Sequence, residues 1–344
     1  MQIELPISKS IANRLLILQA IHGDELMPVS DAFPDDVRLL HSVLTTLRNS
    51  TQSYTTLNLF NCGTAMRFLT AYCAQLEGQT VILDGVERMH HRPIGQLVDA
   101  LREIGAQIEY LGEDGFPPLR IKGCILDKHR IVTLNNPQST QFISALLLIS
   151  ANVQTNCTSP YITLTREVIQ HYTTLHHSTP HYTIERDWSS AAFWYEYVSL
   201  HGGEIELLGL YEHSLQGDKV VADIFAHLGV TTQYMEEGIR IYRSQAILNS
   251  KFLIQNFSAC PDLYPAVAIT CERLGIELHA TGVESLPLKE SDRLRAVREH
   301  RTDHDHRMAM ALLVAGYEVD DTDCISKSYP QFLEQWQNLI RSYE

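Results

Sequence analysis

The sequence of 344 residues has no uninterrupted apolar run of about 18 residues, the length that a membrane-spanning helix needs. Its start, Met1 to Pro6, has neither the basic stretch nor the small-residue cleavage site that marks a secretion signal. We therefore expect a cytoplasmic protein without a membrane partner.

Cysteine is scarce and follows no metal-binding or redox pattern. The seven cysteines are an odd number, and none forms a pair separated by two residues. Reduced thiols fit this pattern better than disulfides. The histidines at His90, His91, His304 and His306 lack further ligands at the usual spacing, so we expect neither a metal nor a cofactor.

Positive charge is in the minority, because 27 Lys and Arg residues accompany 41 Asp and Glu residues, giving a formal net charge of −14. A nucleic-acid partner is therefore not expected, since binding a phosphate backbone requires a basic face. Several cations are nevertheless concentrated in short motifs, a pattern that suits capture of a small anionic metabolite. These cations are Lys9, Arg14, Arg67, Arg92, Lys289, Arg293, Arg307 and Lys327.

The length and the 44% hydrophobic content predict two domains, since a single core rarely grows beyond about 250 to 300 residues. Leu97–Tyr110 and Val221–Tyr234 repeat one pattern of an amphipathic helix, a capping glycine and a strand, followed by a turn and a returning strand. The helix-glycine-strand part recurs around Gly23, Gly78 and Gly316, among other places. This internal repetition predicts two similar α/β domains.

Polar motifs stand where three helices are predicted to begin. They are Ser8–Ser10 with Arg14 one turn later, Gly63–Arg67, and Ser139–Gln141. A helix N-terminus favours an anion, and small or hydroxyl side chains let the ligand approach the backbone. Taken singly, capping residues beside a solvated cation explain the first two motifs better than a binding site does, and the third equally well.

Four further motifs add charge along the chain. Arg92 precedes Pro93 in an extended segment, and Asp262 stands at the entry to a helix predicted over Tyr264–Leu274. Lys289, Glu290 and Arg293 are predicted to lie within one helical turn, and Asp305–Met310 to open the final helix before the loop residue Lys327. Helix caps or solvated charges explain each motif singly, whereas their joint occurrence favours a binding site.

In this order, from about Leu5 to about Trp336, the motifs resemble those of the EPSP synthase family of enolpyruvyl transferases. The resemblance implies an α/β fold of two similar inside-out domains, each built from three βαβαββ units with helices inside and sheets outside. The chain would cross between domains near Ile7 and Ile184. Residues 8–184 would form one domain, and residues 1–7 with 185–344 the other.

The resemblance also implies the activity, which is transfer of the enolpyruvyl group of phosphoenolpyruvate to the 5-hydroxyl of shikimate 3-phosphate by a monomer. The catalytic residues it implies are Lys9, Asp262 and Glu290. The shikimate 3-phosphate set is Lys9, Ser10, Arg14, Ser139, Thr140, Gln141, Thr158, Tyr161, Asp262 and Lys289. The phosphoenolpyruvate set is Lys9, Gly63, Arg67, Arg92, Gln141, Arg293, Arg307 and Lys327.

The chain departs from the family pattern in length. Three segments are short compared with the family, which places strands there: Leu294–His304, Asn49–Phe60 and Leu175–Glu185. Either the protein lacks some outer strands, or the sequence omits internal segments of a longer protein. Ser285 also stands where the family has an asparagine that contacts shikimate. Two alternatives remain open, a non-catalytic descendant and a UDP-N-acetylglucosamine enolpyruvyl transferase.

Overall fold

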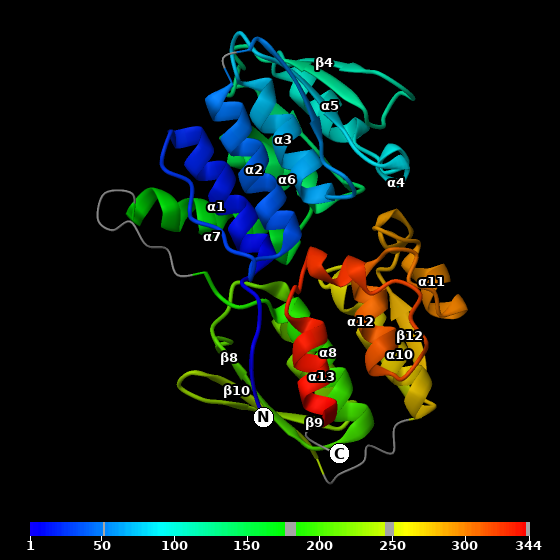
Figure 1. The fold of residues 1–344 in the computed structure, drawn as a ribbon. Helices are drawn as coiled ribbons and strands as arrows, with labels where there is room; N and C mark the ends of the chain where they lie inside the picture. The colour runs from blue at the N-terminus through cyan, green and yellow to red at the C-terminus, as the bar shows by residue number, and fades with distance from the viewer. Residues whose placement is uncertain (51, 176–183, 245–250, 342–344) are drawn as a thin grey trace. The chain divides into compact units, whose positions relative to one another are not determined.

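A computed structural model describes residues 1–50, 52–175, 184–244 and 251–341. The chain divides into two compact units (Figure 1). The first contains Met1–Lys9, Ser30–Asp35 and Ile184–Glu344, and the second contains Ser10–Val29 and Asp36–Thr183. Because Lys9 and Ser30–Asp35 fall in the first unit, the units differ from the predicted 8–184 division, which stays a prediction.

The second unit contains one complete βαβαββ repeat. Its sheet has the order β2-β3-β5-β4, with β2 and β3 parallel and the other neighbours antiparallel. Gly105, at φ +100°, follows α5 and turns the chain into β4, as the sequence predicts. The elements are β2 (Tyr54–Asn58), α3 (Gly63–Ala74), β3 (Thr80–Asp84), α4 (Glu87–His90), α5 (Gly95–Glu103), β4 (Gln107–Tyr110) and β5 (Leu119–Lys122).

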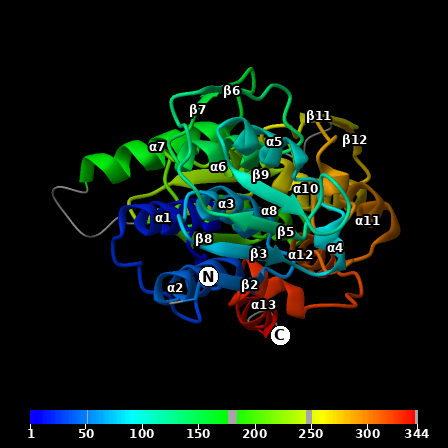
Figure 2. The ribbon, with the colours of Figure 1, turned by 90° about the horizontal axis from the view of Figure 1, so that it is seen from above.

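The remainder of the second unit consists of helices and one short parallel strand pair. The pair β6 and β7 forms a sheet of its own, and α6 packs against both α3 and α7. In Figures 1 and 2 the helices α1, α6 and α7 lie side by side. The elements are α1 (Lys9–His22), α2 (Asp35–Asn49), β6 (Ile131–Thr133), α6 (Thr140–Leu148), β7 (Asn152–Gln154) and α7 (Pro160–Leu175).

The first unit builds its complete repeat from both ends of the chain. The N-terminal strand β1 pairs in parallel with β8, and the sheet continues as β1-β8-β10-β9. An isolated bridge between Ile7 and Arg186 joins the two passages of the chain beside this sheet. The elements are β1 (Gln2–Glu4), α8 (Trp188–His201), β8 (Glu204–Leu208), η1 (Gly217–Val220), α9 (Val221–Ala226), β9 (Val230–Tyr234) and β10 (Gly238–Arg243).

In the rest of the first unit, the described residues form a parallel strand pair, β11 and β12. Helices and short 3-10 turns follow these strands and carry the charged motifs. The elements are β11 (Phe252–Asn256), η2 (Pro261–Leu263), α10 (Tyr264–Leu274), β12 (Glu277–Thr281), η3 (Leu286–Leu288), α11 (Arg293–Glu299), α12 (His306–Val314), η4 (Asp323–Lys327) and α13 (Phe332–Arg341).

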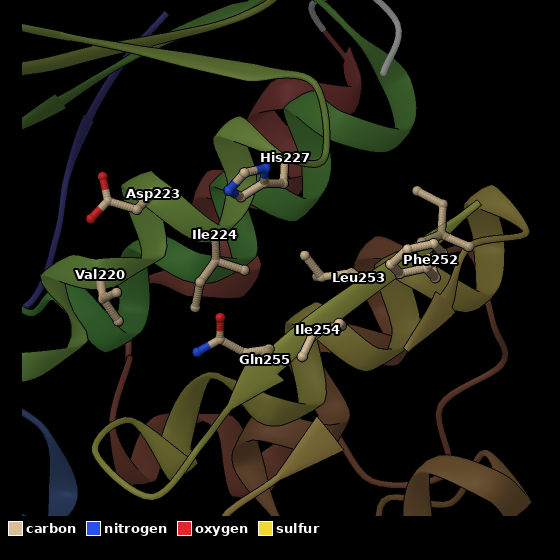
Figure 3. A pocket seen from close by; sticks show the side chains of 9 residues that line it. Val220, Asp223, Ile224, His227, Phe252, Leu253, Ile254 and Gln255 are labelled. Carbon is tan, nitrogen blue, oxygen red and sulfur yellow. The ribbon is translucent and has the colours of Figure 1, made fainter. Parts of the chain in front are cut away.

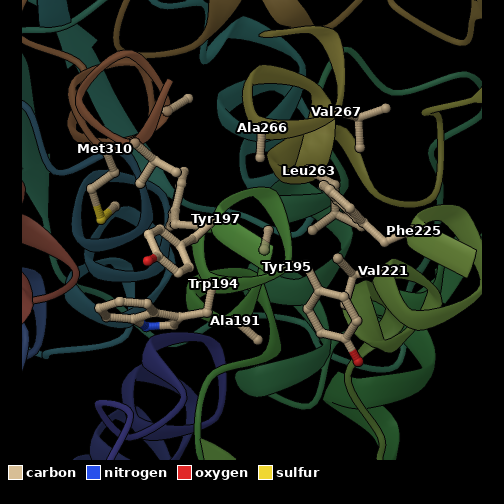
Figure 4. Packing of buried hydrophobic residues seen from close by; sticks show 14 of the residues in the cluster. Ala191, Trp194, Tyr195, Tyr197, Val221, Phe225, Leu263, Ala266, Val267 and Met310 are labelled. Atoms are coloured by element: carbon tan, nitrogen blue, oxygen red, sulfur yellow. The ribbon is translucent and has the colours of Figure 1, made fainter. Parts of the chain in front are cut away.

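Each unit places its helices inside and its sheets outside, as predicted. Nearly every residue of α3 and α8 is buried, which requires neighbours on all sides of these helices. Strands such as β8 alternate buried and more exposed residues, so one face of the sheet packs on the helices. Figure 4 shows the result in the first unit, where Trp194 and Tyr195 of α8 lie among Phe225, Val267 and Met310.

The incomplete repeats correct the predicted secondary structure. The strands expected after Gly23 and Gly316 are absent from the described residues there, because an extended segment needs a hydrogen-bonded neighbour to become a strand. In contrast, the described range 251–341 has no strand between α11 and α12, as expected from the short Leu294–His304 segment. The short Asn49–Phe60 segment contains β2, and most of the third short segment, Leu175–Glu185, lies outside the described residues. The helix opened by Asp305 is not the final one, since α13 follows it.

Among the described residues, no helix is both long and apolar enough to cross a membrane.

Candidate active site

The first unit gathers predicted site residues around one carboxylate, Asp262. It lies in η2, directly before α10, and accepts hydrogen bonds from Nζ of Lys289 (3.2 Å), Nη1 of Arg293 (2.8 Å) and Nη2 of Arg307 (3.0 Å). Burial alone would raise the pKa of Asp262, but the charges of Arg307, Lys289 and Arg293 outweigh burial and hold that pKa well below its usual range. Asp262 is therefore ionised at neutral pH.

Arg293 links three carboxylates. Its Nε lies 2.8 Å from Asp305 Oδ2, and its Nη2 donates to Glu290 Oε2 at 3.2 Å, while Nη1 reaches Asp262. Burial would lower the pKa of Arg293, but Asp305, Asp262 and Glu290 together raise it. With 1% of its side chain exposed, Arg293 is placed to orient the two carboxylates that were predicted to act in catalysis.

Glu290 has a second cationic partner, since Nζ of Lys327 lies 3.2 Å from Glu290 Oε1. The structure corrects the prediction that Lys289 and Glu290 share a helical turn with Arg293. Both lie in the connection between η3 and α11, because Asp292 caps α11 by accepting from the backbone nitrogen of Arg295. Lys327 ends η4 rather than lying in a loop.

Arg307 has unused hydrogen-bonding capacity. Its Nη2 binds Asp262, but its buried Nε and Nη1 have no hydrogen-bond partner among the residues that the structure describes. Asp305 caps α12 and accepts from the backbone nitrogen of Arg307 at 3.0 Å, which fixes the residue at the helix N-terminus. A buried guanidinium with unmet donors is suited to an anionic ligand.

Three residues near this cluster were missed as site residues by the sequence interpretation. Asp187 caps α8 by accepting hydrogen bonds from Ser190. Burial raises the pKa of Asp187 above its usual value, although the charges of Arg307 and Lys9 partly oppose this increase. Burial raises the pKa of Asp218 to about 6, and the charge of Asp262 adds to this. His306 is fully buried beside Arg307. Only Asp187 had a recognisable signal, the Asp-x-x-Ser pattern of a helix cap.

Lys9 is the first residue of α1 and belongs to the first unit. The backbone nitrogen of the preceding Ser8 donates to Glu185 O at 2.8 Å, which anchors this crossing of the chain. The charge of Lys9 influences the pKa values of both Asp187 and His306. Lys9 therefore influences two groups that Arg307 also influences, and its role in catalysis stays a prediction.

In the second unit, the N-termini of α3 and α6 are joined. Ser139 caps α6 by accepting from the backbone nitrogen of Gln141, and Nε2 of Gln141 donates to Thr64 Oγ1 at 2.9 Å. The predicted Gly63–Arg67 and Ser139–Gln141 motifs thus lie together. Thr140 begins α6 directly after the cap, next to backbone amides that favour an anion.

Arg67 and Arg92 flank Gly63. Nη2 of Arg67 donates to Pro93 O at 2.9 Å, and Nη1 of Arg92 donates to the Asn61 carbonyl at 3.1 Å. A Cβ atom at Gly63 would lie 2.7 Å from Arg92 Cζ, closer than real contacts allow. Glycine is therefore needed for the Arg92 guanidinium to occupy this position.

Arg14 is placed differently from the other cations. Its Nε donates to Thr165 Oγ1 at 2.8 Å, its Nη1 to Ser10 O at 2.7 Å, and its Nη2 to Ser144 Oγ and to Tyr161 O. Burial lowers the pKa of Arg14 to about 10. Arg14 thus holds α1, α6 and α7 together. Thr158 is exposed and lies on the connection before α7. The predicted contacts of Arg14 and Thr158 with shikimate 3-phosphate stay predictions.

A pocket of about 300 Å³ lies elsewhere in the first unit, between α9 and β11 (Figure 3). Its walls include Ile224, His227 and Leu253, and none of the predicted site residues lines it. Within the described residues, no group of three or more His, Cys, Asp or Glu side chains is placed to hold a metal ion.

Comparisons with known proteins agree on one family. A family model described as EPSP synthase (3-phosphoshikimate 1-carboxyvinyltransferase) matches residues 1–300 and 298–336. A Bacteroides fragilis protein named 3-phosphoshikimate 1-carboxyvinyltransferase is 35% identical over 401 residues, covering 99% of this chain and 94% of that protein. A Vibrio cholerae protein of the same name is 29% identical and covers 99% of this chain and 97% of its own length.

The fold of the chain is similar to that of a solved structure. A solved structure of EPSP synthase from Acinetobacter baumannii matches with a TM-score of 0.66 and 18% sequence identity, covering 97% of this chain and 94% of that chain. The Bacteroides alignment spans 401 residues, more than the 344 of this chain, and therefore contains gaps on this side. Such gaps agree with the incomplete repeats.

Proposed function

This chain belongs to the EPSP synthase family, and from that premise we propose that it transfers the enolpyruvyl group of phosphoenolpyruvate to the 5-hydroxyl of shikimate 3-phosphate. The products are 5-enolpyruvylshikimate 3-phosphate and inorganic phosphate. The reaction belongs to the biosynthesis of chorismate and the aromatic amino acids. The names of the relatives support this substrate pair over UDP-N-acetylglucosamine.

One observation carries the proposal for this chain in particular. Arg307 is 2% exposed and holds Asp262 with one nitrogen, while its Nε and Nη1 have no partner among the described residues. Burying unmet guanidinium donors costs free energy that an anionic substrate would recover. A chain that had lost its ligand would be free to lose this arrangement, so the geometry favours an enzyme over a non-catalytic descendant.

The proposed chemistry is an addition followed by an elimination. C3 of phosphoenolpyruvate gains a proton, and the 5-hydroxyl oxygen bonds to C2 while its proton passes to Asp262. The tetrahedral ketal phosphate then breaks its C2–O bond to phosphate and loses a proton from C3. Lys9 and Glu290 move the proton at C3, and Lys327 and Arg293 hold the Glu290 carboxylate in place.

The low pKa of Asp262 determines when this carboxylate can accept the proton of the 5-hydroxyl. An ionised carboxylate is ready to accept a hydrogen bond from the 5-hydroxyl, but its three cationic partners make it a weak base. The hydroxyl proton therefore passes to Asp262 while the oxygen bonds to C2, because this bonding makes the hydroxyl acidic, and not before that step.

The binding residues in this proposal are those that the family resemblance implies. Arg67, Arg92 and Gly63 with Arg293, Arg307 and Lys327 hold the carboxylate and phosphate of phosphoenolpyruvate. Ser10, Arg14, Ser139, Thr140, Thr158, Tyr161 and Lys289 hold shikimate 3-phosphate, and Gln141 and Lys9 serve both substrates. Because one chain supplies every named group, we propose a monomer, and the odd number of scattered cysteines favours the reducing cytoplasm.

Phosphate release tests the proposal. The purified protein is incubated with each substrate alone and with both, and the organic product is identified by mass spectrometry. Phosphate is expected only when both substrates are present, and chelators are expected to have no effect. Turnover with UDP-N-acetylglucosamine in place of shikimate 3-phosphate, or no turnover with either acceptor, would contradict the proposal.

A further inference from the structure

One edge of strand β12 has no neighbouring strand among the described residues. In both complete repeats, the second strand of the parallel pair is bonded on its other side to an antiparallel strand, β3 to β5 and β8 to β10. Strand β12 holds the same position beside β11, but within residues 251–341 no returning hairpin lies between α11 and α12. The edge that the complete repeats cover is therefore open in β12.

The bonds to β11 show which backbone groups lie on this open edge. The Glu277 nitrogen donates to Lys251 O at 3.0 Å, and Thr281 O accepts a bond from the segment that follows β11. Because the bonding direction alternates along a strand, the backbone N–H and C=O groups of Leu278 and Ala280 point away from β11. These groups have no hydrogen-bond partner among the described residues.

The side chains of β12 do not protect the open edge. Natural edge strands are protected by lysine, proline or a bulge, and the sequence Glu277–Thr281 contains neither lysine nor proline. Its two exposed charged or ionisable side chains, Glu277 and His279, lie on the same face, with Nε2 of His279 3.4 Å from Glu277 Oε1. This face therefore presents an acid and an imidazole two residues apart.

These features are complementary to those of an identical strand. Two copies related by a twofold axis pair their edges in antiparallel fashion, which is also the direction of β5 and β10 in the complete repeats. A register centred on Leu278 makes Leu278 and the partner's Leu278 a hydrogen-bonded pair. It also places Glu277 opposite the partner's His279 in a non-bonded pair, where side chains approach most closely.

A register shifted by one residue fits less well. Centred on His279, it would place two imidazoles opposite each other and Glu277 opposite the partner's Thr281. Only the register centred on Leu278 joins the acid of each copy to the imidazole of the other while it also pairs the open backbone groups. The edge thus favours a second copy of this chain in one defined register.

We propose that β12 is a self-association edge, at which two copies of this chain form a continuous sheet of order β11-β12-β12-β11. This sheet has four strands, as each complete repeat does. An edge of five residues is a small interface, so the protein is a monomer when dilute and a dimer when concentrated. The monomer proposed as the enzyme remains the catalytic unit, because each chain keeps its own site residues.

Sedimentation equilibrium of the full chain tests the association. The apparent mass should rise from 39.0 kDa toward twice that value as the concentration rises from roughly 10 μM to roughly 1 mM. Glu277→Arg places a second cation opposite the imidazole, and His279→Glu places two carboxylates opposite each other. Each single variant should raise the Kd of the dimer by about tenfold, because the symmetry changes two cross-strand pairs at once.

A mixture of the two variants tests the register. Combining Glu277→Arg protein with His279→Glu protein should restore association to the wild-type level, because the new arginine of one chain faces the new glutamate of the other. No effect within a single chain produces such a rescue. Ala280→Pro removes an N–H group of the open edge without removing a bond to β11, and it should also weaken the dimer. Glu77→Arg, at an exposed turn, is the matched control and should leave association unchanged.

Three results would overturn the proposal. The first is a mass of 39.0 kDa at every concentration of the wild-type protein. The second is a wild-type dimer that both single charge variants leave intact, which would place the contact elsewhere, for example on β11, where Ile254→Lys would then weaken it. The third is a mixture of the two variants that associates no better than either one alone. Circular dichroism verifies the fold of each variant, and the two charge variants, at exposed residues, decide the matter if Ala280→Pro does not fold.

Discussion

At the scale of single residues, the site consists of charges that hold one another. Asp262 is surrounded by Lys289, Arg293 and Arg307, and Glu290 by Arg293 and Lys327. The surrounding cations hold the pKa of Asp262 well below its usual range, and the ion pairs fix the directions of these side chains before any ligand arrives. Such preorganisation is the largest source of rate enhancement in many enzymes.

Glu290→Gln tests the proposed proton transfer. The amide keeps the size of the side chain but cannot exchange a proton at C3, so kcat should fall by about 10²- to 10⁴-fold. Affinity for shikimate 3-phosphate, measured by calorimetry, should change little. Glu299→Gln, which alters only an exposed ion pair of α11, is the control and should retain full activity. A loss of affinity without a loss of turnover would assign Glu290 to binding.

Gly63→Ala tests the contact between Gly63 and Arg92. The added methyl group would displace the Arg92 guanidinium, so KM for phosphoenolpyruvate should rise by roughly tenfold or more while the protein stays folded. Steady-state kinetics at saturating shikimate 3-phosphate measure the effect. Gly112→Ala introduces a methyl group with only an ordinary contact to Pro118 and should leave KM unchanged. An unaltered KM in Gly63→Ala would remove Gly63 and Arg92 from the binding set.

Glu196 of α8 concerns stability rather than catalysis. It is fully buried, its two carboxylate oxygens have no partner among the described residues, and burial raises its pKa well above the usual value. Below the unfolded pKa of 4.5, Glu196 is protonated in both the folded and the unfolded protein, so its ionisation does not change the free energy of unfolding. As pH rises from there toward the folded pKa, the unfolded state ionises first and the free energy of unfolding falls.

Glu196→Gln should therefore stabilise the protein in a pH-dependent way. At pH 8 the gain in unfolding free energy should be roughly 1–3 kcal/mol, and it should shrink toward zero near pH 4. Denaturant unfolding at several pH values measures it. Glu204→Gln, at an exposed end of β8, should show no such dependence. A gain that is the same at every pH would show that ionisation of Glu196 is not its cause.

At the scale of elements, the sequence predicted helix starts better than it predicted strands. α3, α6 and α10 begin where Gly63, Ser139 and Tyr264 indicated, because caps and glycines act within one turn. Lys289 and Glu290 were misplaced on α11, since the charge pattern did not reveal that Asp292 caps the helix. Strands depend on distant partners, and no local pattern showed that the ones expected after Gly23 and Gly316 lacked a neighbour.

Strand β11 is exposed to unwanted pairing with other chains. Its sequence from Phe252 to Asn256 has no charge, proline or glycine, and Phe252 and Ile254 are 57% and 68% exposed. Natural sheets protect such edges with charge. Ile254→Lys should therefore slow aggregation, followed by light scattering, without altering turnover. Ile125→Lys, at an even more exposed residue outside any strand, is the control. An equal effect of both would attribute aggregation to exposed apolar surface in general.

At the scale of the whole molecule, the βαβαββ repeats that were predicted are present, but several of them have fewer strands than the full pattern. Each unit has one complete βαβαββ repeat, and the remaining parts keep their helices with fewer strands. The helix N-termini that carry Gly63, Ser139 and Arg307 are all retained. The electrostatic influence of Lys9 on Asp187 and His306 could not be predicted from the sequence, because Lys9 lies far from both along the chain.

The uneven completeness of the repeats has a consequence for hydrogen exchange. Amides of α3 and α8 lie under full four-stranded sheets and are enclosed on all sides, so their exchange should require global unfolding. Amides of α11, a short helix with several exposed residues, should exchange through local opening at far lower free energy. Because α11 begins with Arg293, the residue that joins Asp262, Glu290 and Asp305, substrate binding should slow exchange most in the least protected helix of the site.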